Sequence, residues 1–413
     1  MSEKRITPIS SRRFVDVGKN ESETREFLKH LEEHGYAIAA SVANPGEIDA
    51  AKSEMWDFLE GCRGMDGRKD TGVRRENIET WHDYDDEGRR RWMGSPSTGI
   101  ISGMGVGQAP FMWRVRSLPG VTNAFAAIWD VGQEDLLVSF DGANVFRPWQ
   151  YDNDWKTRGG WYHIDQNAFN PGKEGKCCVQ GFVLLTDANE ETGSLVVVPG
   201  SHKHFREVSE RNTRGQRHQG TLMDFVQLAK DDEVLETCGG ARLVCARAGD
   251  LVLWDSRTVH CNSPALTEGN KSSSSSLKPS QCNWDLIRMV AYVCMTPSSW
   301  ATDDVLEKRW DAYVNNLTTT HWPHEFVGGT MRPNLPSNDP SLLSEAQKKM
   351  IGGRLSEPPA SATDSIQTPL TEKQREARDL LDQAEETEAK GNHLGAMRLY
   401  KQAYRLDPSL EFP

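Results

Sequence analysis

Four residues in the middle third of the chain have the types and order of a metal-dependent oxidation site. They are His163, Asp165, His260 and Arg288. Two imidazoles and one carboxylate form the ligand set that holds non-haem Fe(II) on one face and leaves the opposite face open for cosubstrate and oxygen. This ligand set leaves one net positive charge on Fe(II), which suits an anionic chelating cosubstrate such as 2-oxoglutarate. The residue types therefore indicate an iron-dependent oxygenase.

The spacing of the first two residues predicts that they act together. His163 and Asp165 are two positions apart, and in an extended strand the side chains at i and i+2 point to the same face. Ile164 then points the other way, into apolar packing. The third ligand must come from another strand, and His260 follows the apolar run from Leu251 to Trp254. We therefore expect two strands to converge on one metal.

The arginine begins the predicted strand 287–295. Its face carries otherwise largely apolar side chains, and a buried cation needs an anionic partner. A planar guanidinium binds a carboxylate through two parallel hydrogen bonds. We therefore expect Arg288 to bind the far carboxylate of the cosubstrate. Arg257, three residues before His260, is the alternative; Arg288 is preferred because it opens an apolar strand that fits the last strand of a barrel.

Taken singly, each of these residues also has an ordinary structural interpretation. A His-x-Asp pair is often a surface or capping pair, and a lone histidine is often a hydrogen-bonded core residue. A lone arginine is often the partner of a structural glutamate. The order of the residues, each on or beside a predicted inward-facing strand, favours the functional interpretation.

Several longer runs carry a resemblance to a known family. They are HIDQ (163–166), GSLVVVPGSHK (193–203), GDLVLWDSRTVH (249–260) and RMVAYVCMTP (288–297), preceded by a helical lead-in at 30–60. In these runs the chain resembles the phytanoyl-CoA dioxygenase-like (PhyH) family of Fe(II)/2-oxoglutarate-dependent oxygenases, over residues 14 to 354. The stretch between His260 and Arg288 is longer than is usual for that family, and a serine-rich run fills it.

The resemblance implies a site and a chemistry. His163, Asp165 and His260 would bind Fe(II), Arg288 would bind 2-oxoglutarate, and O2 would be the second cosubstrate, with no catalytic residue beyond the metal ligands. Gln180 is a second expected contact to the cosubstrate. The expected substrate-lining residues are Trp161, which shares the strand face of His163, and Gln166. Because the carboxylate ligand is present, hydroxylation is favoured over halogenation.

The expected function is hydroxylation of a small molecule with release of succinate and CO2. Two alternatives stay open: an oxygenase acting on a protein or a nucleobase, and a non-catalytic jelly-roll adaptor that works through a C-terminal helical hairpin. A complete ligand set and a buried arginine argue against the adaptor, because a scaffold does not need a buried cation.

The elements that must position these residues are short β-rich runs separated by Gly, Pro and Asn turns. They predict a mainly β fold with flanking helices, a double-stranded β-helix or cupin-like jelly roll. A helix is expected over 119–129, and the irregular stretch 63–102 is expected to be a surface excursion over the site. The expected divisions are a flexible N-terminus (1–20), the catalytic domain (21–354), a Pro/Ser/Thr-rich linker (355–370) and a hairpin similar to one tetratricopeptide repeat (371–413).

Bulk properties limit the partners. The formal net charge of −12 argues against nucleic acid, because phosphate binding requires a basic surface. The eight cysteines include no CxxC spacing, and no signal peptide or long apolar run is seen, so we expect a cytoplasmic protein with no membrane contact. A single helical repeat cannot bury its own apolar face, so the hairpin is expected to dock on the domain, dimerise or bind a protein partner.

Overall fold

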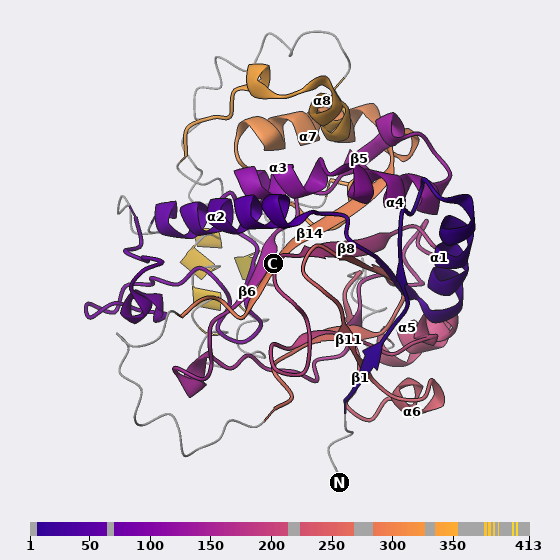
Figure 1. Cartoon of the computed structure of the whole chain (residues 1–413), viewed down its shortest axis with the longest axis horizontal. Coiled ribbons are helices and arrows are strands. Elements are labelled where there is room, and N and C mark those ends of the chain that lie inside the picture. The colour runs from indigo at the N-terminus through magenta and orange to yellow at the C-terminus, as the bar shows by residue number, and fades with distance from the viewer. Residues whose placement is uncertain are drawn as a thin grey trace.

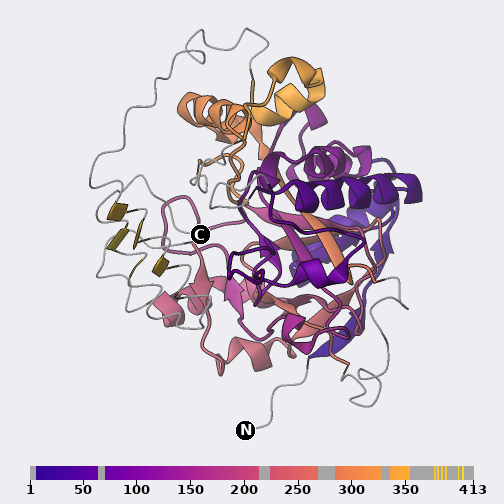
Figure 2. The same cartoon turned by 90° about the vertical axis from the view of Figure 1, so that its left-hand side faces the viewer.

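The computed structural model describes residues 6–63, 70–213, 224–267, 284–326 and 335–353, with scattered positions between Glu376 and Ala403. In these residues two β-sheets lie face to face, and most of the helices pack outside the larger sheet (Figure 1; Figure 2). This arrangement confirms the predicted mainly β jelly roll with flanking helices.

The smaller sheet has six strands and is antiparallel except for the pairing of its first two strands. In spatial order its strands are β1 (Thr7–Ser10), β11 (Arg242–Cys245), β9 (Ser194–Val197), β13 (His260–Ser263), β7 (His163–Ile164) and β10 (Val226–Gln227). Two of the predicted metal ligands therefore lie on neighbouring central strands, β7 and β13.

The larger sheet has eight strands and carries the predicted cosubstrate residues. In spatial order its strands are β2 (Arg13–Phe14), β3 (Tyr36–Ala39), β12 (Leu251–Asp255), β8 (Val179–Leu184), β14 (Arg288–Pro297), β6 (Ala143–Phe146) and β4 (Ile100–Ile101), with β5 (Leu136–Val138) pairing with the far end of β14. Gln180 and Arg288 lie on the adjacent strands β8 and β14.

The larger sheet is buried on both faces, as the side chains of β14 show. Val290 and Tyr292 face the smaller sheet and pack with residues such as Phe182 and Val197. Met289 and Ala291 point to the other face and join the cluster that includes the helices. The predicted alternation along this strand is confirmed, and its continuous apolar composition follows from burial on both sides.

Eight helices are found in the described part of the chain. They are α1 (Glu21–His34), α2 (Pro45–Gly61), α3 (Pro110–Arg116), α4 (Pro119–Trp129), α5 (Phe205–Thr213), α6 (Val234–Thr237), α7 (Asp303–Val314) and α8 (Glu345–Ile351). Helices α2, α3 and α4 cover the larger sheet, and α7 and α8 lie beyond them (Figure 1). The predicted helix over 119–129 is confirmed. None of the described helices is long and apolar enough to cross a membrane.

Local sequence sets where these helices begin and end. Asn44 and Glu47 form a reciprocal capping box at the start of α2, with Pro45 in the first turn. Helix α1 ends at Gly35, which has a left-handed φ of 77°. A Cβ at Gly35 would lie 2.4 Å from Thr258 Oγ1, so only glycine fits this turn, which packs against the segment leading into β13.

The N-terminus differs from the prediction of a flexible segment over 1–20. Residues 7–10 form β1 beside β11, and residues 13–14 form β2 beside β3. Arg13 also forms a bidentate ion pair with the buried Asp250, at 2.6 and 2.7 Å. The edge strand of a sheet has unpaired backbone N–H and C=O groups. Even a short polar segment is ordered where its own backbone can hydrogen-bond to these groups.

The stretch 63–102 was predicted to be a surface excursion over the site, and its described residues are partly exposed and partly buried. Trp81 and Trp92 are buried, and their rings stack with centroids 6.3 Å apart. Arg147 lies over Trp92 at 5.2 Å and over Trp155 at 4.8 Å. The large indole rings therefore anchor an otherwise charged and partly exposed stretch to the core.

Other predictions fall on residues that the structure does not describe. The serine-rich run lies largely within 268–283, and the linker lies within 354–375. Of residues 371–413 only scattered helical positions are described, among which Ala384 and Ala403 are buried. The helical hairpin therefore stays a prediction.

Arg309 of α7 is buried, and its guanidinium donates only to backbone carbonyls. The acceptors are the carbonyl oxygens of Ile351, Pro323, Val138 and Met350, at 2.7–3.0 Å.

We expect Arg309→Met to lower the free energy of unfolding by at least about 3 kcal/mol, because it leaves these carbonyls buried without donors. Urea denaturation measures the change. The exposed neighbour Lys308 gives the control Lys308→Met, expected to change stability by less than about 0.5 kcal/mol; equal effects of the two variants would contradict the role of Arg309.

Candidate metal centre

Strand pairing brings the three predicted ligands together. His163 and His260 are direct partners across β7 and β13, and their ring centroids are 4.2 Å apart. Asp165 follows His163 by two positions, while Ile164 between them packs into a separate apolar cluster. One atom from each of the three side chains lies within 4.8 Å of the others. The structure thus juxtaposes two imidazoles and a carboxylate at one point.

Backbone carbonyls orient both imidazoles. His163 Nδ1 lies 3.1 Å from the carbonyl oxygen of Trp161, and His260 Nδ1 lies 2.9 Å from that of Thr258. A carbonyl only accepts, so each Nδ1 carries the hydrogen and donates it, and each Nε2 keeps its lone pair. The Nε2 atoms lie 3.6 and 3.2 Å from the oxygens of Asp165. Both histidines thus direct their free nitrogens toward the carboxylate, as metal ligands do.

The electrostatic environment keeps the predicted ligands in the protonation states that bind a cation. Burial, together with the nearby His260, lowers the pKa of His163 to about 4. Burial acts to raise the pKa of Asp165, but His163 and His260 more than offset it and hold that pKa well below its usual range. At neutral pH the site therefore offers a neutral imidazole and an ionised carboxylate, the protonation states that metal binding requires.

Gln180 reaches the site from the opposite sheet. Its Nε2 donates to Asp165 Oδ2 at 2.8 Å and also lies 3.3 Å from Ser256 Oγ. The prediction was a contact to the cosubstrate, and the structure gives this amide a direct bond to the carboxylate ligand. Gln180 therefore fixes the orientation of Asp165, a supporting role that ligands of metal sites commonly require.

Arg288 is a buried cation with no carboxylate partner among the described residues. Its NH1 group donates to Asn262 Oδ1 at 3.0 Å, but Nε and NH2 are buried without a hydrogen-bond partner. The guanidinium lies over Phe146 and Phe182, at 4.8 and 5.4 Å. Burial lowers the pKa of Arg288 to about 10. Buried donors in native proteins nearly always have acceptors, so these two groups indicate a binding position for an anion.

The rival arginine is already paired. Arg257 donates to both carboxylate oxygens of Asp255, from Nε at 2.8 Å and from NH2 at 2.7 Å. This ion pair satisfies the cation, so Arg257 has no need of a bound carboxylate. The structure favours Arg288, as the sequence did.

An aromatic surface adjoins the first ligand. Trp161 stacks on His163 with ring centroids 4.6 Å apart and planes inclined by only 6°. Phe225 lies 4.8 Å from the same ring and is 41% exposed, which is unusual for a phenylalanine. Trp161 thus lies where a substrate-lining residue is expected. Phe225 was missed because it directly precedes β10, a strand too short to produce a sequence pattern.

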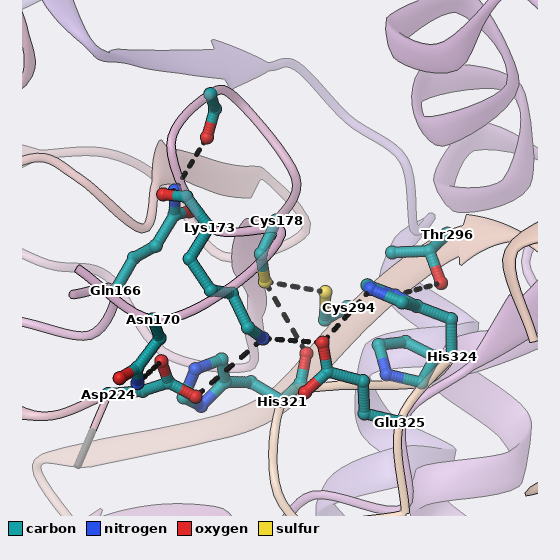
Figure 3. Close-up of polar contacts among 12 residues, drawn as sticks. Gln166, Asn170, Lys173, Cys178, Asp224, Cys294, Thr296, His321, His324 and Glu325 are labelled. Carbon is teal, nitrogen blue, oxygen red and sulfur yellow. Dashed lines mark hydrogen bonds and ion pairs between the residues drawn. The ribbon is translucent and has the colours of Figure 1, made fainter. Parts of the chain in front are cut away.

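Gln166, the other predicted substrate-lining residue, points away from the predicted metal ligands. Its side chain is buried, and its Nε2 donates to the carbonyl oxygens of Lys173 and Gly175, at 2.8 and 2.5 Å (Figure 3). Adjacent residues of an extended chain point to opposite sides, so Gln166 turns into its own loop when Asp165 faces the metal position. Its contacts shape the loop that follows the ligands, and the structure gives no support to a substrate-lining role.

Comparison with known proteins identifies the family. The family model of phytanoyl-CoA dioxygenase (PhyH) matches residues 31–273. The "Ava biosynthesis cluster protein O" of Aspergillus versicolor is 32% identical over 228 residues, which cover 54% of this chain and 66% of that protein. The "Ectoine dioxygenase" of Bordetella bronchiseptica is 28% identical over 163 residues, which cover 37% of this chain and 48% of that protein. The chain thus spans about two thirds of the first relative and about half of the second.

Solved structures show weaker likeness. EctD from S. alaskensis, crystallised with 2-oxoglutarate and 5-hydroxyectoine, has a TM-score of 0.40 and 13% identity, with 72% of this chain and 85% of that chain covered. The carbocyclase SnoK from nogalamycin biosynthesis has a TM-score of 0.40 and 19% identity, with 68% and 86% covered.

The hydrogen bond from Gln180 to Asp165 leads to a prediction about metal affinity. Gln180→Leu keeps the approximate side-chain volume but removes the donor, so we expect Fe(II) to bind about 10- to 100-fold more weakly, with the fold retained. Anaerobic Fe(II) titration measures the affinity. Gln227→Leu is the matched control, since Gln227 pairs with His163 across β10 but its side chain is exposed. Unchanged affinity in Gln180→Leu would show that this bond does not support the ligand.

Proposed function

The chain belongs to the phytanoyl-CoA dioxygenase (PhyH) family, whose members are Fe(II)- and 2-oxoglutarate-dependent dioxygenases, and we propose that it hydroxylates a small molecule with release of succinate and CO2. The observation that carries the proposal is the combination, in one sandwich, of a ligand triad and a buried arginine with two unsatisfied donors. The triad could bind a divalent cation, and the arginine could bind one carboxylate of a dianionic cosubstrate.

The residues present fit both groups. His163, Asp165 and His260 would hold Fe(II), because two imidazoles and one carboxylate form a ligand set that suits this ion. Arg288 would hold the distant carboxylate of 2-oxoglutarate, with its unpartnered nitrogens as the donors. When bound, iron together with 2-oxoglutarate and O2 supplies the oxidising power needed to replace a C–H bond by C–O–H.

The protein's own contribution is orientation and shielding. Two backbone carbonyls fix the imidazole rings, and Gln180 fixes the carboxylate. The two sheets enclose the site in apolar side chains, which strengthens each charged interaction and limits the access of water. Trp161 and Phe225 adjoin the ligands and would contact the substrate.

A small-molecule substrate is favoured over a macromolecular one. One relative, the ectoine dioxygenase of Bordetella bronchiseptica, is named for a small-molecule substrate. A protein partner bound through residues 371–413 stays a prediction. We also propose a cytoplasmic location, supported by the seven described cysteines, all of which are free thiols, including a pair with sulfur atoms 3.5 Å apart.

The ligand assignment predicts a spectroscopic result. Wild-type protein mixed anaerobically with Fe(II) and 2-oxoglutarate should show the weak visible charge-transfer band of the chelate, and His163→Ala should lose it because one of three ligands is removed. Asp165→Ala should likewise abolish turnover with the fold retained. A band of equal strength in His163→Ala would refute the assignment.

The two arginines give a second prediction. Arg288→Met should weaken 2-oxoglutarate binding by about 100-fold or more, because the charge-assisted hydrogen bonds to its far carboxylate are lost. Arg257→Met should change that affinity by less than about threefold, since its partner is Asp255. Titration of the Fe(II)-loaded variants with 2-oxoglutarate measures both. The reverse order of effects would assign the cosubstrate to Arg257.

A further inference from the structure

Phe225 lies on the side of the smaller sheet that carries the predicted metal ligands. Where β10 pairs with β7, Val226 is opposite Ile164, and both side chains belong to the same apolar cluster. Side chains alternate along an extended chain, so Phe225, the residue before Val226, points to the other side. Its ring centroid lies 4.8 Å from that of His163, with the ring planes inclined by 31°. The strand register thus places this phenylalanine against a predicted metal ligand.

The ring of Phe225 keeps an open apolar surface. Among the phenylalanines in the described part of the chain it alone is exposed, at 41%, whereas the adjacent Val226 is 1% exposed. Trp161, which is partly exposed, stacks on the same imidazole of His163 at 4.6 Å. Binding sites for small molecules are lined mainly by apolar and aromatic side chains. The surface beside this ligand has that character.

Asp224, the residue before Phe225, is fixed by two contacts from another segment. Asn170 Nδ2 donates to Asp224 Oδ1 at 2.8 Å, and the Lys173 ammonium lies 3.6 Å from Asp224 Oδ2 (Figure 3). Both partners lie in the loop that follows Asp165. The backbone that carries the Phe225 ring is therefore tied to the loop next to the metal ligands.

The loop that holds Asp224 is itself anchored. Lys173 is buried, and its ammonium lies 2.6 Å from Glu325 and 3.0 Å from the ring centroid of Trp322 (Figure 3). Gln166 donates to the backbone carbonyl oxygen of Lys173 at 2.8 Å. A strand of two residues supplies few backbone hydrogen bonds, so contacts of this kind are needed to hold an exposed ring beside it in one place.

We infer that Phe225 determines specificity by packing against a flat, apolar part of the substrate. Asp224, through its contacts with Asn170 and Lys173, positions the ring. This inference rests on the proposed function, and it names the substrate class: a small molecule that carries a flat apolar ring. A carbon oxidised at the metal must lie close to His163, so the substrate is the molecule that covers the adjacent phenyl ring. Aromatic groups pack on each other in offset-stacked or edge-to-face arrangements.

The test compares flat rings with flexible polar chains. Protein loaded anaerobically with Fe(II) and 2-oxoglutarate is equilibrated with a panel of ring alcohols, each paired with a polyether alcohol of similar size, such as 2-naphthylmethanol with triethylene glycol. Equilibrium dialysis measures the affinities. In wild type we expect the ring compounds to bind at least about 10-fold more tightly than the polyethers. Phe225→Ala should weaken binding of the ring compounds about 10-fold and leave that of the polyethers unchanged, because the stacked ring and its buried apolar area are lost.

Variants of Asp224 test the positioning role. Asp224→Ala should also weaken binding of the ring compounds, and Asp224→Asn should recover most of the loss, because its amide oxygen can still accept from Asn170. The double variant of Asp224→Ala with Phe225→Ala should bind no more weakly than Phe225→Ala alone, since the carboxylate acts through the ring. Asp231→Ala is the matched control, because Asp231 is an exposed carboxylate just beyond β10. It should keep the wild-type affinities.

The charge-transfer band of Fe(II) with 2-oxoglutarate distinguishes failure of this inference from failure of the proposed function. Absence of the band in wild type would refute the proposed function itself. A normal band in wild type without binding of any ring compound, with equal affinity for rings and polyethers, or with undiminished ring affinity in Phe225→Ala would overturn the substrate contact. Loss of the band in Phe225→Ala would assign the ring to the metal centre instead. Unchanged ring affinity in Asp224→Ala would overturn the positioning role.

Discussion

The pairing of His163 with His260 across β7 and β13 is the constraint on which the rest of the site depends. Side chains alternate along a strand, so a shift of one residue in this register would turn one imidazole out of the sandwich. The neighbouring pairs, His260 with Val197 and Cys261 with Val196, extend the same register into the apolar core. Core packing thus stabilises the relative position of the two histidines, because a change of register would also expose apolar side chains.

Three arginines of this fold, Arg257, Arg288 and Arg309, differ in how fully their hydrogen-bond donors are paired. Arg309 donates to four carbonyls and Arg257 to one carboxylate, and each is thereby satisfied. Arg288 is equally buried, but only its NH1 group has a partner. Buried guanidinium donors that lack acceptors are costly, so the unpaired donors of Arg288 are consistent with the binding of an anionic ligand.

Short-range patterns in the sequence predicted the parts of this molecule that follow from local geometry. The spacing of His163 and Asp165, the alternation along β14 and the helix over 119–129 need only strand or helix periodicity, and the structure confirms them. Contacts between distant segments could not be predicted in this way. Gln180 was expected near the cosubstrate, but its bond to Asp165 depends on how two sheets face each other. Phe225 directly precedes a strand of only two residues. Trp81 and Trp92 anchor the stretch 63–102 to the core, which the charged residues around them did not indicate.

The site draws its parts from both sheets, and this division explains how it can be precise and still open to substrate. The smaller sheet supplies the imidazoles, whereas β8 and β14 of the larger sheet supply Gln180 and Arg288. Helices pack on the outer face of the larger sheet, so Gln180 and Arg288 both lie on a layer that is buried on both sides. Beside the smaller sheet, Trp161 and Phe225 adjoin the ring of His163. Both aromatic residues lie outside β7 and β13, so variation at these two positions leaves the pairing of the two histidines in place.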